Sequence, residues 1–219
     1  MGSILTASRR IELIHYANRN QAYIVEDDYD SEFRFDGNTI ESLQYLAPDR
    51  VIYVGTFSKT LMPALRIGYM VLPDELCERM REAKFVSDIH SPIFEQLTLA
   101  RFIESGAFEL HIRKMQKLYY RKRNYLISCL KKTFGERVLI SGAAAGLHFV
   151  GSFDGIRFDS DLLNQIQHGG IEIASVGKHL VNSTLSKEYD NALIFGYGNT
   201  SIEEMETGIK ILASIIDKS

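Results

Sequence analysis

The sequence contains no tryptophan, two cysteines and four prolines among its 219 residues. Cys77 and Cys129 are too few and too far apart for a disulfide framework, and neither lies in a Cys/His spacing that suggests zinc. Apolar runs reach at most about five residues, whereas a membrane span needs about 20. Net charge is −3, so the chain as a whole has no basic bias toward nucleic acid. These absences predict a reducing, cytoplasmic setting, no metal site and no membrane segment.

Apolar periodicity divides the chain into three parts, predicted at residues 1–106, 107–135 and 136–219. Met1–Ser3 has no signal-peptide pattern and is interpreted as an expression scar. The first part has predicted strands at 21–25, 51–54 and 66–72 and helices at 8–19, 74–85 and 93–104. Short apolar runs separated by loops are typical of parallel strands in an α/β layer.

A long helix is predicted from Phe108 to Phe134, with Gly135 as its C-terminal stop. Its length of roughly 40 Å would suffice to join two domains. The last part has predicted strands at 147–153, 171–174 and 192–197 and a helix at 159–168. A final helix begins at Thr200–Ser201, where Glu203 and Glu204 are placed for a capping box. This last part is therefore predicted to be a small α/β domain.

Lys59 lies among hydroxyls directly after the apolar run at 51–54. Taken alone, it would be interpreted as a surface lysine at a helix end. Thr56 and Ser58 precede it, and Arg66 follows seven positions later. Strand ends are where α/β folds bind ligands, and hydroxyls with a guanidinium suit a phosphate dianion. A lysine near a cation can serve as the amine that attacks an aldehyde.

An acidic cluster, Glu26–Asp30, follows the first predicted strand. Such runs are usually solvated loops or helix caps. Because residues two apart on a strand share a face, Asp27 and Tyr29 would point the same way. If the strand ends one residue earlier, Asp28 or Asp30 would take that place. Pyridoxal phosphate needs an amine for its aldehyde, a phosphate site and a carboxylate for its pyridine nitrogen. The two strand ends together predict such a site.

Two strings carry a resemblance to a known family. They are Glu26–Arg34 (EDDYDSEFR) and Gly55–Tyr69 (GTFSKTLMPALRIGY). The chain resembles fold-type I aminotransferases, and more narrowly the aminotransferase-like domain of MocR/GabR-type bacterial transcription regulators. The resemblance covers nearly the whole chain and is weak after residue 140. It implies an α/β fold of the pyridoxal-phosphate-dependent transferase type, with part of the large domain, the long helix and the small domain.

The resemblance also implies roles for individual residues. Lys59 would form the internal aldimine, Asp27 would pair with the pyridine nitrogen, and Tyr29 with the ring oxygen. The phosphate would be held by Thr56, Ser58 and Arg66. Family members begin with a winged helix-turn-helix domain and a first half of the aminotransferase-like domain. The stacking aromatic and the phosphate turn of that half have no counterpart here. We therefore expect a C-terminal fragment that binds the cofactor weakly or not at all.

The residue that would hold an effector carboxylate is less clear from the sequence. Many aminotransferases place an arginine at a strand like 192–197, and this one has none. Lys178 or His179 before that strand could serve, although both are more simply solvated loop residues. Cations along the long helix are interpreted as its solvated face rather than a DNA-binding surface. They are Arg113, Lys114, Lys117, Arg121, Lys122, Arg123, Lys131 and Lys132.

Three functions follow as hypotheses. The first is the effector-sensing domain of a MocR/GabR-like regulator, in which an amino compound reacts at Lys59. Such a protein would self-associate as a dimer and contact DNA only through a helix-turn-helix domain absent from this sequence. The second is a genuine class I/II aminotransferase, with Lys59 as general acid and base. The third is an assembly module with a residual site. Whether the protein transaminates is left open by the sequence.

Overall fold

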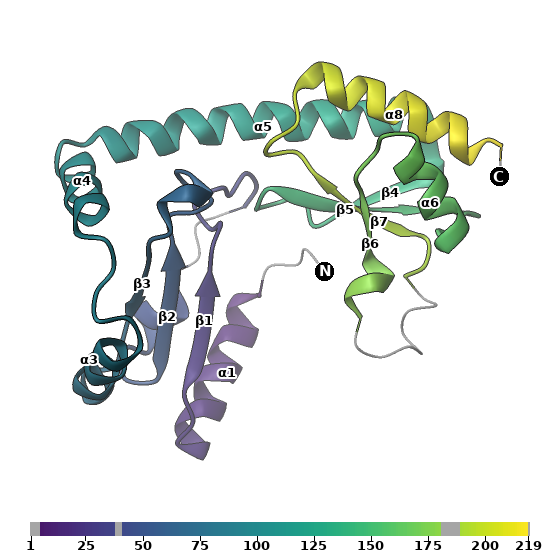
Figure 1. The fold of residues 1–219 in the computed structure, drawn as a ribbon. Helices are drawn as coiled ribbons and strands as arrows, with labels where there is room; N and C mark the ends of the chain where they lie inside the picture. The colour runs from purple at the N-terminus through teal and green to yellow at the C-terminus, as the bar shows by residue number, and fades with distance from the viewer. Residues whose placement is uncertain (1–4, 38–40, 181–188, 219) are drawn as a thin grey trace. The chain divides into compact units, whose positions relative to one another are not determined.

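The computed structural model describes residues 5–37, 41–180 and 189–218, so that Met1–Ser3 lies outside the described residues. It divides the chain into two compact units (Figure 1). The N-terminal unit comprises residues 5–32 and 37–114. The C-terminal unit comprises 33–36 and 115–218. No described helix is long and apolar enough to cross a membrane.

The N-terminal unit holds a three-stranded sheet and four α-helices that lie wholly within it. The strands are β1 (Ile24–Asp28), β2 (Val51–Thr56) and β3 (Gly68–Val71), in the order β1-β2-β3. The helices are α1 (Ala7–Asn20), α2 (Leu43–Leu46), α3 (Asp74–Asp88) and α4 (Ile93–Glu104). A 3-10 turn, η1 (Pro63–Leu65), lies between β2 and β3.

Two sequence-based predictions for this sheet were wrong. The first strand begins at Ile24 rather than residue 21, because Gln21 ends α1 in the left-handed conformation and its N–H bonds the last turn of that helix. The third strand runs antiparallel to β2, whereas β1 and β2 are parallel as predicted. A parallel return needs a crossover of a dozen or more residues. The connection from Phe57 to Ile67 is shorter than that and leads directly back along β2.

The C-terminal unit contains an antiparallel sheet in the order β4-β5-β7-β6. Its strands are β4 (Val138–Ser141), β5 (His148–Phe153), β6 (Ala174–Ser175) and β7 (Ala192–Gly196). Its helices are α6 (Ser160–His168) and α8 (Ile202–Ile216), with 3-10 turns η2 (Gly135–Arg137) and η3 (Val176–His179). Sequence reasoning missed β4 and placed β6 too early, since both strands are too short to show alternation.

Helix α5 (Ala107–Phe134) begins in the N-terminal unit and continues into the C-terminal unit. It ends before Gly135, whose φ of 59° is a conformation that glycine adopts at little cost. Within the C-terminal unit, Leu130 and Phe134 of this helix pack in the core, where Phe134 contacts Phe153 edge to face at 5.1 Å. The second half of α5 is therefore held by an apolar core.

The start of α8 confirms the predicted capping box, with Glu204 as the acidic partner. Ser201 Oγ accepts a hydrogen bond from Glu204 N–H at 3.2 Å, and Ser201 N–H donates to Glu204 Oε2 at 2.7 Å. The helix also buries one apolar face. Its buried members are Met205, Ile209, Leu212 and Ile216.

A short segment of the chain, Phe33–Asp36, belongs to the C-terminal unit although it follows β1 closely in sequence. Phe35 N–H donates to Ala144 O at 2.9 Å, and Gly146 N–H donates to Phe33 O at 2.9 Å. Phe33 is fully buried and meets the ring of Tyr119 edge to face at 4.9 Å. The residues after the acidic cluster are thus part of the C-terminal core.

Candidate functional site

Asp27 is separated from its acidic neighbours by the pleat of β1. Its backbone pairs with Val54 of β2, and its side chain lies on the sheet face that Val25 also occupies. The side chain of Asp27 is exposed, and within the described ranges no hydrogen bond or ion pair engages it. Asp27 therefore presents a carboxylate that no described group neutralises.

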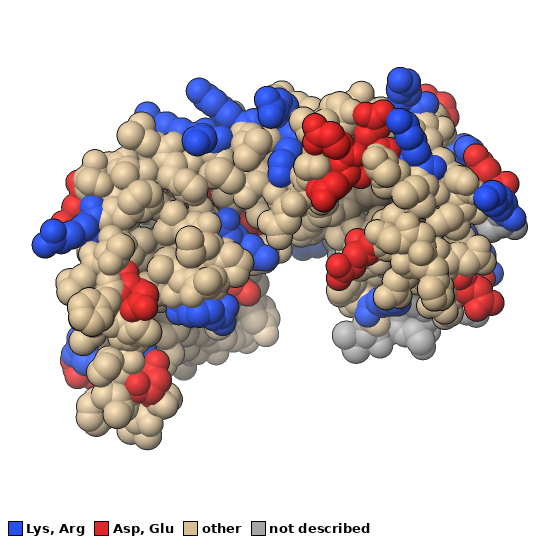
Figure 2. All heavy atoms as spheres, turned by 45° about the horizontal axis from the view of Figure 1, so that its top comes forward, with Lys and Arg blue, Asp and Glu red and all other residues tan. Residues whose placement is uncertain are grey.

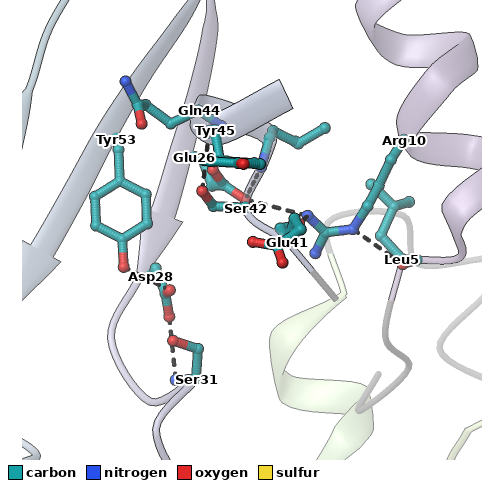
Figure 3. Close-up of polar contacts among 11 residues, drawn as sticks. Leu5, Arg10, Glu26, Asp28, Ser31, Glu41, Ser42, Gln44, Tyr45 and Tyr53 are labelled. Atoms are coloured by element: carbon teal, nitrogen blue, oxygen red, sulfur yellow. Dashed lines mark hydrogen bonds and ion pairs between the residues drawn. The ribbon is translucent and has the colours of Figure 1, made fainter. Parts of the chain in front are cut away.

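Glu26 lies on the opposite face and has a structural partner (Figure 3). Its two carboxylate oxygens accept hydrogen bonds from the N–H groups of Leu43 and Gln44, at 2.9 and 3.0 Å, at the start of α2. Arg10 lies 3.4 Å from Glu26 Oε1, and both side chains are largely buried. Glu26 thus anchors the loop before β2.

Asp28 is also engaged, by the hydroxyl of Tyr53 at 2.7 Å and the N–H of Ser31 at 3.1 Å (Figure 3). Burial raises the pKa of the Tyr53 hydroxyl, and its hydrogen bond to Asp28 raises it further. Burial likewise raises the pKa of Glu32, with an added contribution from the negative charges of Asp28 and Asp30. Asp28, named as an alternative to Asp27, already serves a tyrosine hydroxyl and a turn.

Tyr29 lies beyond the end of β1, which terminates at Asp28. Strand alternation therefore does not place Tyr29 on the same face as Asp27, contrary to the prediction from the sequence. Its side chain is 42% exposed. The pKa of its hydroxyl is raised, first by burial and then by the nearby charges of Asp30 and Asp27. Tyr29 and Asp27 are hence close enough to interact electrostatically without sharing a strand.

The hydroxyls of Thr56 and Ser58 meet at the end of β2. Their Oγ atoms lie 3.1 Å apart, and Ser58 N–H donates to Thr56 Oγ1 at 3.2 Å. Thr56 stands two residues after Val54, the partner of Asp27, so Asp27 and Thr56 side chains emerge from the same face of neighbouring strands. The register thus brings a carboxylate and a hydroxyl pair to one sheet face.

Lys59 and Arg66 lie on the connection between β2 and β3. Phe57 N–H donates to Ile67 O at 3.1 Å, which closes this connection at its base. Arg66 ends the η1 turn with φ 51°, a left-handed conformation uncommon for a residue with a side chain. Both side chains are exposed, and no carboxylate of the described chain lies within ion-pairing distance of either. Three cavities of about 410, 460 and 510 Å³ are lined by other residues.

Thr60, the residue after Lys59, is only 2% exposed, and its hydroxyl has no hydrogen-bond partner among the described groups. Its carbonyl oxygen lies 2.9 Å from Nε2 of His111 on α5. Sequence reasoning missed this contact because the two residues are 51 positions apart. No local pattern marks His111, whose neighbours in sequence are apolar or basic.

Lys178 and His179 lie in η3 of the C-terminal unit, and both are exposed. Strand β7 (ALIFG) contains no arginine, and its central residue is Ile194. Lys178 and His179 thus belong to the C-terminal unit, whereas Lys59 belongs to the N-terminal unit.

The basic residues of α5 follow the prediction of a solvated face with one clear exception. Basic side chains gather on the surface over α5 (Figure 2), and most of those named are exposed. Arg123 is 5% exposed instead. Its Nη1 lies 2.6 Å from Asp36 Oδ2 and 2.8 Å from Ala143 O, and its guanidinium faces the rings of Phe35 and Tyr120 at 4.9 Å. Arg123 therefore binds the 33–36 segment to α5 instead of facing solvent.

Comparison with known proteins agrees with this arrangement. Residues 1–155 match the family described as aminotransferase class I and II. The chain belongs to this family. Among its relatives, the HTH-type transcriptional regulator YdeL of Bacillus subtilis is 37% identical over 97% of this chain and 45% of its own length. The probable rhizopine catabolism regulatory protein MocR of Rhizobium meliloti is 31% identical over 98% of this chain and 43% of its own.

Solved structures lead to the same fold. The kynurenine aminotransferase of Pyrococcus horikoshii is 27% identical, with a TM-score of 0.86 over 99% of this chain and 53% of that protein. The chain thus spans about half the length of the proteins that it matches. Both the fold-type I assignment and the resemblance to MocR-type regulators are confirmed.

The family implies pyridoxal phosphate, and the residues of the N-terminal unit fit its parts. The Lys59 amine suits the aldehyde, and the paired hydroxyls of Thr56 and Ser58 with the exposed Arg66 guanidinium suit the phosphate. The carboxylate of Asp27, which no described group neutralises, suits a protonated ring nitrogen on the face that carries Thr56. No described group of three or more His, Cys, Asp or Glu side chains could hold a metal ion.

Proposed function

We propose that this chain forms the part of an effector-sensing, pyridoxal-phosphate-binding domain of a MocR-type transcription regulator that carries the cofactor lysine, Lys59. One observation carries the proposal: relatives that align with nearly the whole chain at 37% and 36% identity are HTH-type transcriptional regulators. Solved aminotransferases share the fold at lower identity. The sequence is thus nearer to the regulators than to these enzymes.

When bound, pyridoxal phosphate supplies an aldehyde that condenses with amines and a ring that withdraws electrons. In the proposal, Lys59 provides the amine that holds the aldehyde carbon. Asp27 would keep the ring nitrogen protonated, and the hydroxyl of Tyr29 would donate a hydrogen bond to the ring oxygen. The hydroxyls of Thr56 and Ser58 and the guanidinium of Arg66 bind the phosphate. The roles of Asp27 and Thr56 are supported by the sheet face that the two residues share.

The ligand sensed would be an amino compound, since an amine is what exchanges with Lys59. Its carboxylate would be received by Lys178 or His179, because β7 provides no arginine. A lysine is a point charge on a flexible stem and orients a carboxylate less strictly than a bidentate guanidinium. Weak orientation favours sensing over turnover, because catalysis demands a fixed geometry at the reacting bond.

The wider assembly is part of the same proposal. The chain would form the end of the large domain (1–106), the interdomain helix (107–135) and the small domain (136–219). It would self-associate as a dimer in the cytoplasm, where a bacterial regulator can bind chromosomal DNA. DNA contact would be made by a winged helix-turn-helix segment, a proposal supported by relatives whose names describe HTH-type transcriptional regulators. Binding of the cofactor to these 219 residues alone would be weak, because few preorganised contacts are available.

The second candidate is a genuine aminotransferase. It is favoured by the kynurenine aminotransferase, whose fold covers 99% of the chain at 27% identity. Here Lys59 would also move the α-proton as general acid and base. In this reading the effector would be a substrate.

Spectroscopy and a keto-acid assay on the protein as its gene encodes it separate the two candidates. For the regulator we expect an amino compound to change the cofactor's absorbance while keto-acid formation stays well below ordinary enzyme rates of roughly 1–10³ s⁻¹. Lys59→Ala should abolish the absorbance change, whereas Lys84→Ala should not. Sustained turnover within the ordinary range would make the aminotransferase the correct function.

A further inference from the structure

His111 touches the loop that carries Lys59 although it belongs to a different element. It lies in the first turns of α5, and its Nε2 is 2.9 Å from the carbonyl oxygen of Thr60. A carbonyl oxygen can only accept, so Nε2 must carry the hydrogen in this contact. The bond therefore places a hydrogen on Nε2 and holds the Thr60–Leu61 peptide, which begins one residue after Lys59.

Aromatic packing holds the start of α5 against the same loop. The rings of Phe57 and Phe108 lie 5.9 Å apart, and Phe102 of α4 contacts both Phe108 and His111 at 6.5 Å. All four residues belong to the N-terminal unit. The imidazole is thus held at the loop by its surroundings rather than reaching it from a mobile stem.

Lys59 is anchored on both sides while its own side chain stays exposed. On one side, Ser58 N–H donates to Thr56 Oγ1 at 3.2 Å. On the other side, Thr60 is only 2% exposed, and its carbonyl oxygen is held by His111. Leu61 N–H completes the turn by donating to Phe57 O at 2.9 Å. These bonds restrict the backbone conformation of Lys59. Among them, the hydrogen bond from His111 comes from a side chain outside the loop.

We propose that His111 is a positioning residue for Lys59. By holding the Thr60 carbonyl, it restricts the backbone next to Lys59 and thereby limits where the exposed Lys59 amine can reach. This inference rests on the proposed function for the identity of Lys59, but the ordering of the loop by His111 does not. Because coupling between two sites is reciprocal, a group bound at Lys59 changes the strength of the His111–Thr60 bond in turn. Helix α5 would then register what Lys59 holds.

Two variants separate the hydrogen bond from the packing. His111→Phe keeps a ring of similar shape and loses the donor, whereas His111→Gln keeps an N–H donor on a side chain of similar reach. Hydrogen exchange of the peptide covering residues 57–62 is measured in the 219-residue chain without added ligand. We expect exchange at least about threefold faster in His111→Phe and near the original rate in His111→Gln. Equal exchange in all three proteins would overturn the proposal.

A second measurement addresses Lys59 itself. The same variants are made in the protein as its gene encodes it, treated with pyridoxal phosphate, reduced with borohydride and digested, and the label on Lys59 is divided by that on Lys84. We expect His111→Phe to lower this ratio about three- to tenfold and His111→Gln to restore it. An unchanged ratio in His111→Phe would overturn the positioning role. If the unaltered protein, as its gene encodes it, shows no preference for Lys59, the proposed function fails, and the exchange data alone decide whether His111 orders the loop.

Discussion

The two units bury their apolar residues very differently. Both hydrophobic clusters of the described chain consist of C-terminal-unit residues alone, among them Leu130, Phe153 and Ile166 at 0% exposure. The N-terminal unit, in contrast, leaves large apolar side chains in the open, with Val86 and Phe94 each 85% exposed. The predicted cofactor residues lie in the N-terminal unit, whose apolar side chains are less well covered. Packing and candidate chemistry are thus assigned to different parts of the chain.

The difference explains why the sequence is informative about the site and less so about the sheet around it. The site residues are local: Thr56, Ser58, Lys59 and Arg66 fall within eleven positions, and their order alone suggests the chemistry. The sheet depends on pairing between distant segments. A surface with this much exposed apolar area is typical of one that another surface covers. We therefore expect the N-terminal unit, and not the C-terminal unit, to mediate self-association.

The largest effect should come from opening the C-terminal core. Phe153→Ala removes a fully buried ring that contacts Phe134, Phe158 and Phe195. The free energy of unfolding should fall by about 3–5 kcal/mol, because transfer and cavity costs add. Phe94→Ala, at an 85% exposed position, should change it by less than about 0.5 kcal/mol. Denaturant unfolding of both variants measures the contrast, and similar losses would contradict it.

The next largest effect concerns Arg123, which ties the 33–36 segment to α5. Arg123→Met keeps the apolar stem and removes the charge, leaving Asp36 and the Ala143 carbonyl without their guanidinium partner. We expect a loss of about 1.5–3 kcal/mol in unfolding free energy, because hydrogen bonds that involve a charged group contribute about that much. Asp36 is 58% exposed, so Asp36→Asn should cost less. Lys210→Met breaks an exposed pair with Glu206 and should cost at most about 1 kcal/mol. Equal losses for Arg123→Met and Lys210→Met would show that burial of the pair is unimportant.

A smaller effect is expected at the capping box of α8. Ser201→Ala removes the hydroxyl that accepts from Glu204 N–H and should destabilise the C-terminal unit by about 1 kcal/mol. Ser128 provides a matched control, since it is exposed in the middle of α5 and Ser128→Ala replaces it with a better helix former. The midpoint temperature of thermal unfolding should therefore fall only for Ser201→Ala. A parallel fall for Ser128→Ala would rule out capping as the cause.

The smallest change in stability should accompany the exposed surface of the N-terminal unit, where association changes instead. Phe94→Ser should leave unfolding nearly unaltered yet weaken self-association at least about tenfold, because it removes an exposed apolar ring. Sedimentation velocity across a range of concentrations measures this. Leu139→Ser, at a 70% exposed position of the C-terminal unit, is the control and should leave association unchanged. A monomer at high concentration in the unaltered chain would remove the reason for this prediction.

Much of the fold follows from local signals, and the errors have a common cause. Helix α4 lies at the predicted Ile93–Glu104, and the Ser201 capping box marks the start of α8. The direction of β3 was missed because it depends on the length of a connection rather than on periodicity. His111 and Arg123 were missed as structural residues because their partners, Thr60 and Asp36, lie 51 and 87 positions away. Long-range polar contacts leave no periodic trace in a single sequence.

The most direct test of the account is the identity of the lysine that holds the cofactor. Pyridoxal phosphate is added to the protein as its gene encodes it, the product is reduced with borohydride, and the labelled peptides are mapped. We expect the pyridoxyl group to be enriched on Lys59, inorganic phosphate to compete with this labelling, and Arg66→Met to lower it. Lys84, which bonds Asp88 in the same unit, and Lys178 should carry only background label. Preferential labelling of Lys84 or Lys178, unaffected by phosphate, would contradict the assignment of Lys59.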